Sequence, residues 1–299
     1  MLKKPFDWVD HCYGVGVYMM NRAERLGLDP IEMFVLGFLH DIGYVFTDYC
    51  HEQAGADILR KAGFRKELVN AVLYHGRSEV YLRTVAGEEF ITAEYKLLTE
   101  ADGHVSGTGQ VVSSDRRLKD VLNRDHDRGV IETSIMMAIE GNKEPSPISE
   151  VEPINNIPDP TKWCRHVLGV ALYMMGKART LGLDPTLMFL CGFLHDIGKL
   201  VEVKGHSLHG ATILTNLRMS PKIIHAVRHH GWSPYKVIDT FTESGLTKEY
   251  LLLVEADLSI DGWGKEIGFY NRLLSIMERY GEESDNYINA RDTIKYLTT

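Results

Sequence analysis

Apolar residues recur along most of the chain with the spacing of an α-helix rather than the alternation of a β-strand. Over residues 6–26 the apolar stripe consists of Trp8, Cys12, Val15, Tyr18, Met19 and Leu26. Gly27 then marks a stop, and Asp29-Pro30 has the form of an N-cap before a first-position proline, with Glu32 placed to complete a capping box. Further helical patterns cover residues 51–62, 65–75, 91–102 and 113–123. The sequence therefore predicts an all-α fold.

The chain is a tandem duplication, because it matches itself at an offset of 155 residues. Residues 8–43 and 163–198 share 22 identities in 36 positions, among them LGLDP and GFLHDIG in both copies. The same offset continues without insertion through AVLYHG over AVRHHG and YKLLTEAD over YLLLVEAD. Two copies of one unit thus make up most of the chain.

A proline-rich segment, EGNKEPSPISEVEPINNIPDPTK, separates the copies and holds five of the ten prolines. Proline disfavours both helix interior and central strand, so this segment is expected to be a stiff, extended connection. The predicted organisation is a first domain over residues 1–144, a linker over 145–160 and a second domain over 161–299.

Composition narrows the class of protein. The net charge of −8 argues against a broad nucleic-acid surface, although bound cations could still attract a small anionic substrate. No apolar run approaches the roughly 20 residues of a membrane span, and the N-terminus has no signal-peptide pattern, so we expect a cytoplasmic protein that does not bind membranes. The four cysteines form no CxxC pair and are expected to be free, buried or half-buried thiols.

Four histidines and two aspartates occupy matching positions in both copies. One His-Asp pair in each copy, His40-Asp41 and His195-Asp196, directly follows the apolar run GFL and should lie at the edge of a core. An unpaired polar group there costs on the order of a few kcal/mol. A bound metal would satisfy such groups. The first copy has His11, His40, Asp41, His51, His75 and Asp102; the second has His166, His195, Asp196, His206, His230 and Asp257.

These motifs, with FLHDIG followed by AV-x-[YH]-HG, resemble the HD-domain metal-dependent phosphohydrolase superfamily, and each copy resembles its two-metal branch. Within that branch the sequence is similar to the symmetrical dinucleoside-tetraphosphate hydrolases, although those have a single domain. The resemblance implies one metal held by His166, His195, Asp196 and Asp257. Asp196 would bridge to a second metal held by His206 and His230. The first copy would use His11, His40, Asp41 and Asp102 for one metal, with Asp41 bridging to His51 and His75.

Mixed imidazole and carboxylate ligands suit iron, manganese, cobalt, nickel or zinc better than magnesium or calcium. Two such divalent ions per domain, about 3.5–4 Å apart, would activate a bridging water and clamp the oxygens of a phosphoryl group. The predicted catalytic residues are the bridging Asp41 and Asp196 together with Lys199. The resemblance gives the lysine of HDIGK the role of neutralising a substrate phosphate, while a surface lysine near a helix end is the alternative interpretation.

We therefore expect a two-metal phosphohydrolase that acts on a small phosphate compound, specifically a nucleotide, and not on extended nucleic acid. The alternatives are a di-iron oxygenase of the HD type, which Tyr44 in place of lysine leaves open for the first copy, and a non-enzymatic regulatory protein that binds metal or nucleotide.

The second copy is expected to carry most of the activity, because its differences from the first add cationic or proton-transferring groups. They are Tyr44 against Lys199, Glu52 against Ser207, Ala54 against His209, and Tyr74 against His229. The glycine-rich stretches 103–110 and 259–268 are interpreted as loops beside the last aspartate with no phosphate role.

Overall fold

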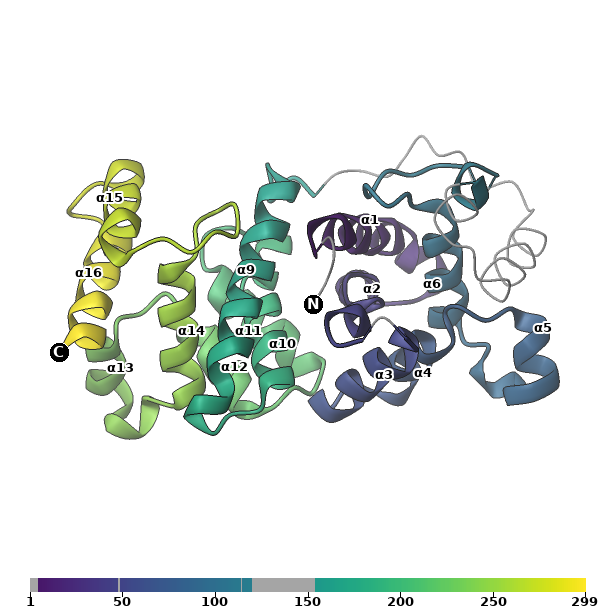
Figure 1. Ribbon diagram of the computed structural model, residues 1–299, viewed down its shortest axis with the longest axis horizontal. Coiled ribbons are helices and arrows are strands. Elements are labelled where there is room, and N and C mark those ends of the chain that lie inside the picture. Colours follow the sequence, from purple (N-terminus) through teal and green to yellow (C-terminus); the bar gives the residue numbers. More distant parts are fainter. Residues whose placement is uncertain (1–4, 48, 114, 120–153) are drawn as a thin grey trace. The chain divides into compact units, whose positions relative to one another are not determined.

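The computed structural model describes residues 5–47, 49–113, 115–119 and 154–299, and these ranges are predominantly helical (Figure 1). The chain divides into two compact units, Met1–Ile154 and Asn155–Thr299. Two isolated β-bridges, Val105 with Val111 and Ile260 with Glu266, are the extended pairings in the described ranges, which contain no longer strand. The predicted all-α fold is therefore confirmed.

The described part of the first unit is a succession of helices joined by short turns. Its elements are α1 (Pro5–Ala23), η1 (Glu24–Leu26), α2 (Pro30–Leu39), η2 (Ile42–Val45), α3 (His51–Ala62), α4 (Lys66–Tyr74), α5 (Glu79–Tyr81), η3 (Leu82–Ala86), η4 (Glu88–Phe90) and α6 (Ala93–His104). η3 is a π-helical turn, and η1, η2 and η4 are 3₁₀ turns.

The second unit repeats this order and is described to the end of the chain. Its elements are α9 (Pro160–Ala178), η6 (Arg179–Leu181), α10 (Pro185–Leu194), η7 (Ile197–Leu200), α11 (His206–Asn216), α12 (Pro221–His229), α13 (Pro234–Phe241), η8 (Glu243–Gly245), α14 (Lys248–Ser259), α15 (Phe269–Tyr280) and α16 (Asp285–Thr298). α9, α10, α11, α12 and α14 begin 155 residues after α1, α2, α3, α4 and α6, so the sequence repeat is also a repeat of helix boundaries.

Local chemistry sets the boundaries of the first helices. Gly27 ends η1 at a φ of 69°, in the left-handed region that glycine adopts without strain. Asp29 caps α2, because its Oδ1 accepts a hydrogen bond from the Glu32 amide at 2.7 Å. The Glu32 carboxylate is engaged elsewhere: it accepts hydrogen bonds from Arg65 Nε at 2.9 Å and Nη2 at 2.6 Å. The predicted N-cap is confirmed, while Glu32 serves a tertiary ion pair in place of the capping box.

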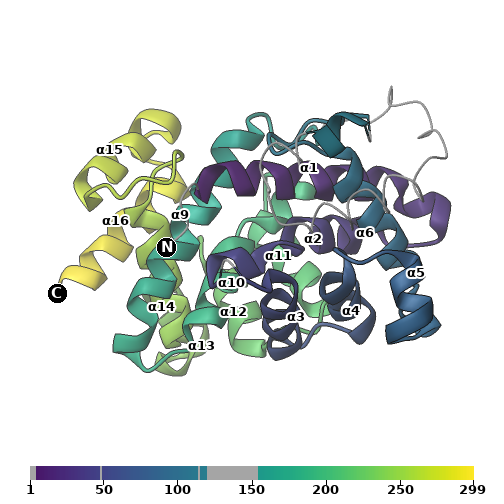
Figure 2. The same ribbon diagram turned by 45° about the vertical axis from the view of Figure 1, so that its right-hand side comes forward.

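α1 packs along α2 in the first unit, as the two views in Figures 1 and 2 show. The helices approach closely at Gly16 and Gly37, since a Cβ added at Gly37 would lie only 2.7 Å from the Gly16 nitrogen. Phe34 and Phe38 are fully buried on the same helix. This contact brings the end of α2, where the HD pair lies, against the middle of α1.

Two sequence predictions fall partly outside the described residues. Of the helix expected over 113–123, residues 115–119 are helical, and residues 114 and 120–123 lie outside the described ranges. Of the expected linker, residues 145–153 also lie outside them. Within the second unit, Asn156 contacts the body of the fold, because its Nδ2 donates a hydrogen bond to the Val201 carbonyl at 2.7 Å.

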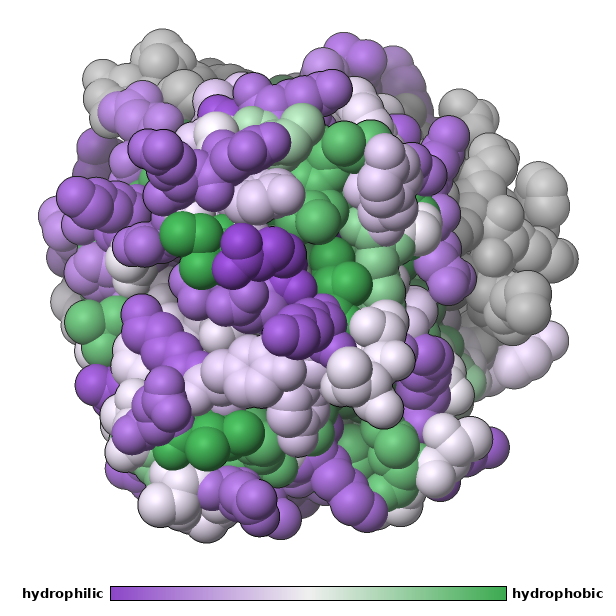
Figure 3. All heavy atoms as spheres, turned by 90° about the vertical axis from the view of Figure 1, so that its left-hand side faces the viewer, coloured by the Kyte–Doolittle hydropathy of each residue, from purple (hydrophilic) through white to green (hydrophobic). Residues whose placement is uncertain are grey.

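The cysteines differ in their exposure to solvent. Cys12, Cys164 and Cys191 are buried, but Cys50 is exposed, so the prediction of buried or half-buried thiols is wrong for Cys50. On the face in Figure 3, apolar residues gather in a band and in smaller groups among polar side chains. None of the helices in the described ranges combines the length and the apolarity that a membrane crossing needs.

Candidate metal centres

Five helices in each unit converge on one cluster of histidines and aspartates. In the first unit the contributing elements are α1, the end of α2, the start of α3, the end of α4, and α6; they supply His11, His40, Asp41, His51, His75 and Asp102. In the second unit α9, α10, α11, α12 and α14 supply His166, His195, Asp196, His206, His230 and Asp257. The structure thus brings together both sets of six residues that the sequence singled out, into a first and a second cluster.

The aspartate of the HD pair faces histidines on two sides. Asp41 Oδ1 lies 3.2 Å from His51 Nε2 and 3.3 Å from His75 Nε2, while its Oδ2 lies 3.4 Å from His40 Nε2. The two oxygens of one carboxylate therefore face different imidazoles.

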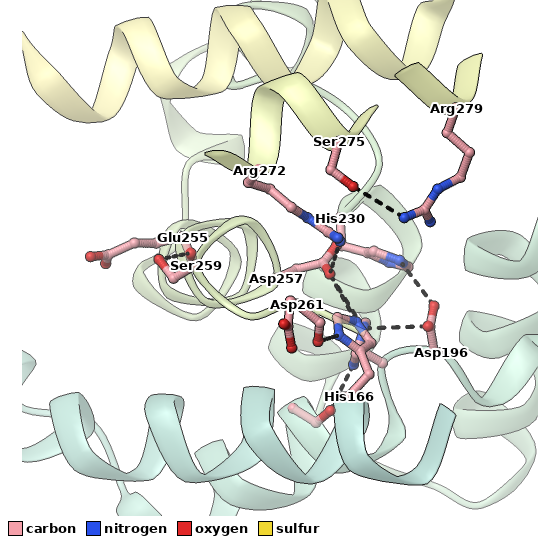
Figure 4. Close-up of polar contacts among 12 residues, drawn as sticks. His166, Asp196, His230, Glu255, Asp257, Ser259, Asp261, Arg272, Ser275 and Arg279 are labelled. Atoms are coloured by element: carbon pink, nitrogen blue, oxygen red, sulfur yellow. Dashed lines mark hydrogen bonds and ion pairs between the residues drawn. The ribbon is translucent and has the colours of Figure 1, made fainter. Parts of the chain in front are cut away.

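The second cluster has the same arrangement. Asp196 Oδ1 lies 3.1 Å from His206 Nε2, and its Oδ2 lies 3.7 Å from His195 Nε2. Asp196 Oδ1 also lies 3.8 Å from His230 Nε2 (Figure 4). Because this contact pattern recurs in both units, it is a property of the repeated fold and not of one copy.

The last aspartate of each copy pairs with the first histidine. Asp102 Oδ1 lies 3.0 Å from His11 Nε2, and Asp257 Oδ1 lies 3.1 Å from His166 Nε2. The side chain of Asp196 is only 3% exposed, whereas that of Asp257 is 25% exposed. The second cluster is therefore closed around the HD pair and more open toward the last aspartate.

Backbone carbonyl groups orient most of these imidazoles. His40 Nδ1 donates to the Gly37 carbonyl at 2.7 Å, and His195 Nδ1 to the Gly192 carbonyl at 2.7 Å. Since a carbonyl only accepts, Nδ1 carries the proton and Nε2 faces the cluster. The same bond is made by His11 to Ser106, His75 to Val72, His166 to Asp261, His206 to Val203, and His230 to Val227.

Two of the inward-facing nitrogens lack a hydrogen-bond partner. His40 Nε2 and His195 Nε2 are buried and make no hydrogen bond among the described residues, on side chains that are 0% exposed. A buried polar atom without a partner is costly, and a metal ion would satisfy it. Groups of three that could share an ion include His11 with His40 and Asp102 in the first cluster, and His195 with His230 and Asp257 in the second. The residues present therefore fit a metal in both clusters.

Burial and charge act in opposite directions on the buried aspartates. Burial alone would raise the pKa of Asp196, but Lys199 and the surrounding histidines outweigh it and hold that pKa well below its usual range. The pKa of Asp41 is also held well below its usual range, because His40, His51 and His75 outweigh burial. Both carboxyl groups are consequently ionised and available as ligands at neutral pH.

The histidines of the clusters differ in protonation. Burial lowers the pKa of His40 and that of His195 to about 4, so both are neutral at pH 7. Burial also opposes charge on His75, but its hydrogen bond to Asp41 prevails and raises its pKa to about 9. A metal that binds His75 must therefore displace a proton.

The two clusters differ beside the HD pair. Lys199 forms an ion pair with Asp196 in the second unit. Tyr44, at the matching position of the first unit, instead stacks on His51 with ring centroids 3.8 Å apart. The predicted catalytic Lys199 thus lies against the predicted bridging carboxylate.

One further difference between the copies, at His229, does not add charge at the cluster as the sequence suggested. The ring of His229 packs against Trp232 and Phe241, with centroids 4.6 and 5.0 Å away, and burial lowers its pKa to about 4. His229 is therefore neutral at pH 7, and the expectation that it adds cationic potential is wrong. His209, which is half-buried, has its Nε2 3.5 Å from Glu202 Oε2.

Sequence reasoning missed the contribution of the loops that follow the last aspartates. The Ser106 and Asp261 carbonyls, in the stretches interpreted only as glycine-rich loops, each accept the Nδ1 proton of the first histidine at 3.0 Å. The sequence hint was that the repeat aligns Gly109 with Gly264. In the structure both glycines have a positive φ.

Sequence reasoning also gave no role to an arginine that contacts each last aspartate. Arg117 Nη2 lies 3.0 Å from Asp102 Oδ1, and Arg272 Nη2 lies 3.7 Å from Asp257 Oδ1 (Figure 4). The matching positions of Arg117 and Arg272 in the repeat were the available signal.

Comparison with protein families identifies the HD domain in two segments of this chain, residues 8–104 and 164–257. These segments contain all twelve clustered residues. No solved structure matches the chain.

Among curated proteins, the chain is similar to several enzymes named Ribonuclease Y. That of Clostridium kluyveri is 44% identical over 72 residues, which are 22% of this chain and 14% of the relative. That of Clostridium novyi is 40% identical over 80 residues, or 25% of this chain and 16% of the relative. That of Clostridium botulinum is 47% identical over 71 residues, or 22% and 14%. The matched part is thus a small fraction of each relative.

Proposed function

The chain belongs to the HD domain family of metal-dependent phosphohydrolases, and from that premise we propose that each unit is a two-metal centre for the hydrolysis of phosphate esters. The observation that carries the proposal is the placement of Asp41 and Asp196, each with its two oxygens directed at different histidines. One carboxylate that faces two sets of imidazoles is the arrangement that a bridging ligand requires.

The proposed ligands of the second unit fall into two groups around Asp196. His166, His195, Asp196 and Asp257 would hold one divalent transition metal, and Asp196 would share a second with His206 and His230. In the first unit His11, His40, Asp41 and Asp102 would hold one metal, and Asp41 would share a second with His51 and His75. Iron, manganese, cobalt, nickel and zinc suit these nitrogen and oxygen donors.

When bound, the metals supply an activated water and polarise the phosphoryl oxygens. The side chains of the protein would hold the ions, and the more exposed side of the cluster, at Asp257, would admit the substrate. Lys199, 28% exposed beside Asp196, is positioned to neutralise a phosphate oxygen of the substrate. Asp41 and Asp196 are the catalytic residues in the sense that they hold both ions against the reacting group.

The proposed substrate is a small phosphate compound, specifically a nucleotide. Val201, Val203 and Leu208, which lie near His206 in the sequence, are exposed. Apolar side chains next to a phosphate-binding centre suit a nucleoside attached to that phosphate. The net charge of −8 disfavours an extended nucleic acid, which would require a basic surface.

A phosphodiester in RNA is the second candidate, because the similar proteins are named as ribonucleases. The matched segment is only 14–16% of those relatives, so it supports a shared hydrolytic unit more directly than a shared substrate.

The test is a reconstitution of metal-free protein with Mn²⁺, Co²⁺, Ni²⁺, Fe²⁺ or Zn²⁺, followed by assay against nucleotides, dinucleoside polyphosphates, simple phosphomonoesters and short RNA. The control is the double variant Asp41→Ala, Asp196→Ala. We expect release of phosphate or nucleotide by the loaded protein and none by the control. Oxygen consumption by the Fe²⁺ form without hydrolysis would support a di-iron oxygenase instead. Metal-loaded protein that hydrolyses no substrate would favour a regulatory protein.

A further inference from the structure

Arg272 reaches the second cluster from a helix that is otherwise lightly packed. None of the residues of α15 is buried, yet the Arg272 side chain is only 14% exposed and its guanidinium points at Asp257 (Figure 4). A long cationic side chain is normally solvated at its charged end. Arg272 instead directs its charge inward, at a carboxylate that the proposed function assigns to a metal.

The first unit places an arginine at the same point. Arg117 follows the 155-residue offset, and its Nε donates to the Asp102 carbonyl at 3.1 Å while its Nη2 donates to Asp102 Oδ1 at 3.0 Å. Arg272 has the looser contact, a single ion pair of 3.7 Å with Asp257. Both copies thus contain a guanidinium beside the last aspartate, and the second copy holds it less tightly.

Each arginine keeps unused hydrogen-bonding capacity. Arg117 Nη1 and Arg272 Nε are buried and have no hydrogen-bond partner among the described residues. A guanidinium has five N–H donors in a planar fork that matches the oxygens of a phosphate. Each guanidinium thus keeps a buried N–H group that could donate to a ligand.

The charges of the second cluster explain what the guanidinium could bind. Asp196 and Asp257 are balanced by Lys199 and Arg272, so the cluster is formally neutral before any metal binds. Two divalent ions on the same carboxylates would leave a formal excess of about four positive charges, which anions must offset. The first cluster, with Tyr44 in place of lysine, would have a smaller excess.

We propose that Arg272 is a substrate-binding residue of the second unit, whose guanidinium passes from Asp257 to the phosphate of the substrate when metal occupies the cluster. This inference rests on the proposed function and refines its substrate class. The metals and two side-chain cations, Lys199 and Arg272, favour a phosphate group that carries at least two negative charges. That group is a terminal phosphate or a pyrophosphate, and a singly charged phosphodiester fits less well. In the metal-free protein both cations are engaged by carboxylates, so phosphate binding requires metal.

The experiment uses the full chain with Asp41→Ala, which removes the bridging ligand of the first unit. Calorimetry measures the affinity of this protein for Mn²⁺, and then the affinity of the Mn²⁺-loaded protein for inorganic phosphate and pyrophosphate. Arg272→Gln is expected to weaken phosphate and pyrophosphate binding at least tenfold, while Mn²⁺ affinity stays equal or rises because a competitor for Asp257 is gone. Arg272→Lys should restore part of the phosphate affinity. Arg291→Gln, which alters an exposed arginine paired with Asp292 in α16, is the matched control and should change neither affinity.

The opposite pattern overturns the inference. If Arg272→Gln weakens Mn²⁺ binding and leaves the phosphate affinity of the loaded protein unchanged, Arg272 only positions Asp257. Tight phosphate binding by the metal-free protein would also contradict it. Failure of the proposed function is a separate result: loaded protein that binds phosphate through Arg272 but hydrolyses no ester would retain this inference and lose the activity. If Arg272→Gln hydrolyses substrate normally and its phosphate affinity is unchanged, the proposed function stands and the role of Arg272 in phosphate binding is refuted.

Discussion

The Lys199 ammonium pairs with the Asp196 carboxylate three residues before it, and this ion pair lies inside the second cluster. Charge on Asp196 raises the pKa of Lys199 against the opposing effect of burial, so the lysine is cationic throughout the neutral range. The first unit has an aromatic ring at this position, stacked on a proposed ligand. Two sites with matching ligands therefore offer a substrate phosphate different electrostatic surroundings.

From this difference we predict that the second unit carries most of the hydrolytic activity. Removing a bridging carboxylate should abolish turnover in its own unit alone, because the two ions lose their shared ligand. Asp196→Ala is expected to lower total activity by roughly tenfold or more, and Asp41→Ala by less than twofold. The reason is that Lys199 is present only in the second unit, and a fixed cation stabilises the phosphoryl transition state by about a few kcal/mol. Each variant is checked for intact helicity and for metal at the untouched site. Activity that survives Asp196→Ala and vanishes with Asp41→Ala would reverse the assignment.

Exchanging the residues at this position tests the lysine itself. In an Asp41→Ala background, Lys199→Tyr should lower kcat/KM of the second unit by about 100-fold, the usual cost of one charge-stabilising donor. The reciprocal Tyr44→Lys, in an Asp196→Ala background, should raise kcat/KM of the first unit. Equal activity of Lys199→Tyr and its parent would show that the lysine is only a surface charge.

Metal content and its pH dependence form a third prediction. Both clusters retain all six proposed ligands, so reconstituted protein should hold up to four ions per chain by elemental analysis. The pKa of His75 is raised to about 9, which stabilises the metal-free fold below pH 6.5 and loses that contribution as pH rises through 9. Metal needs the same nitrogen unprotonated. The rise in Tm on Mn²⁺ loading should therefore increase between about pH 6 and pH 9, with protons released on binding. One ion or fewer per chain, or a pH-independent rise in Tm, would contradict this.

A fourth prediction concerns the glycine of the second HDIG turn. A Cβ at Gly198 would lie 1.9 Å from the His206 carbonyl oxygen, on the backbone that begins α11. Gly198→Ala should therefore push α11 away, destabilise the second unit by about 1–3 kcal/mol, and weaken its metal binding. Gly176→Ala is the matched control, because a Cβ there meets nothing within 4 Å and alanine favours the helix by about 0.5–1 kcal/mol. Calorimetric unfolding and metal titration of both variants provide the measurement, and equal stability of the two would refute the steric argument.

Much of the fold and of the proposed ligand set can be predicted from the sequence, because each position can be compared with its counterpart in the other copy. The paired histidines and aspartates identify the clusters, and Gly27, Asp29 and Pro30 identify a helix boundary through strictly local chemistry. What the sequence did not reveal depends on tertiary contacts. Glu32 satisfies Arg65, 33 residues away, and the Ser106 carbonyl orients His11, 95 residues away. Neither partner can be inferred from spacing along one helix.

The misjudged histidine illustrates the same limit. His229 adjoins the proposed ligand His230 in sequence, but consecutive helical residues point about 100° apart. Its ring consequently packs with Trp232 and Phe241, where burial keeps it neutral. The loose contact of Arg272 with Asp257, in contrast to the two hydrogen bonds of Arg117, was equally invisible in the repeat.

The hydrogen bonds from His40 and His195 to the carbonyls of Gly37 and Gly192 bear on which metal each cluster takes up. Each bond spans three residues at the end of one helix and depends on the helix alone, so the imidazole keeps its orientation whether or not an ion is present. An apoprotein of this kind can exchange one ion for another without refolding. The element found in each cluster would then follow the metals available to the protein and the Irving–Williams order, and the same polypeptide could work with different metals under different conditions.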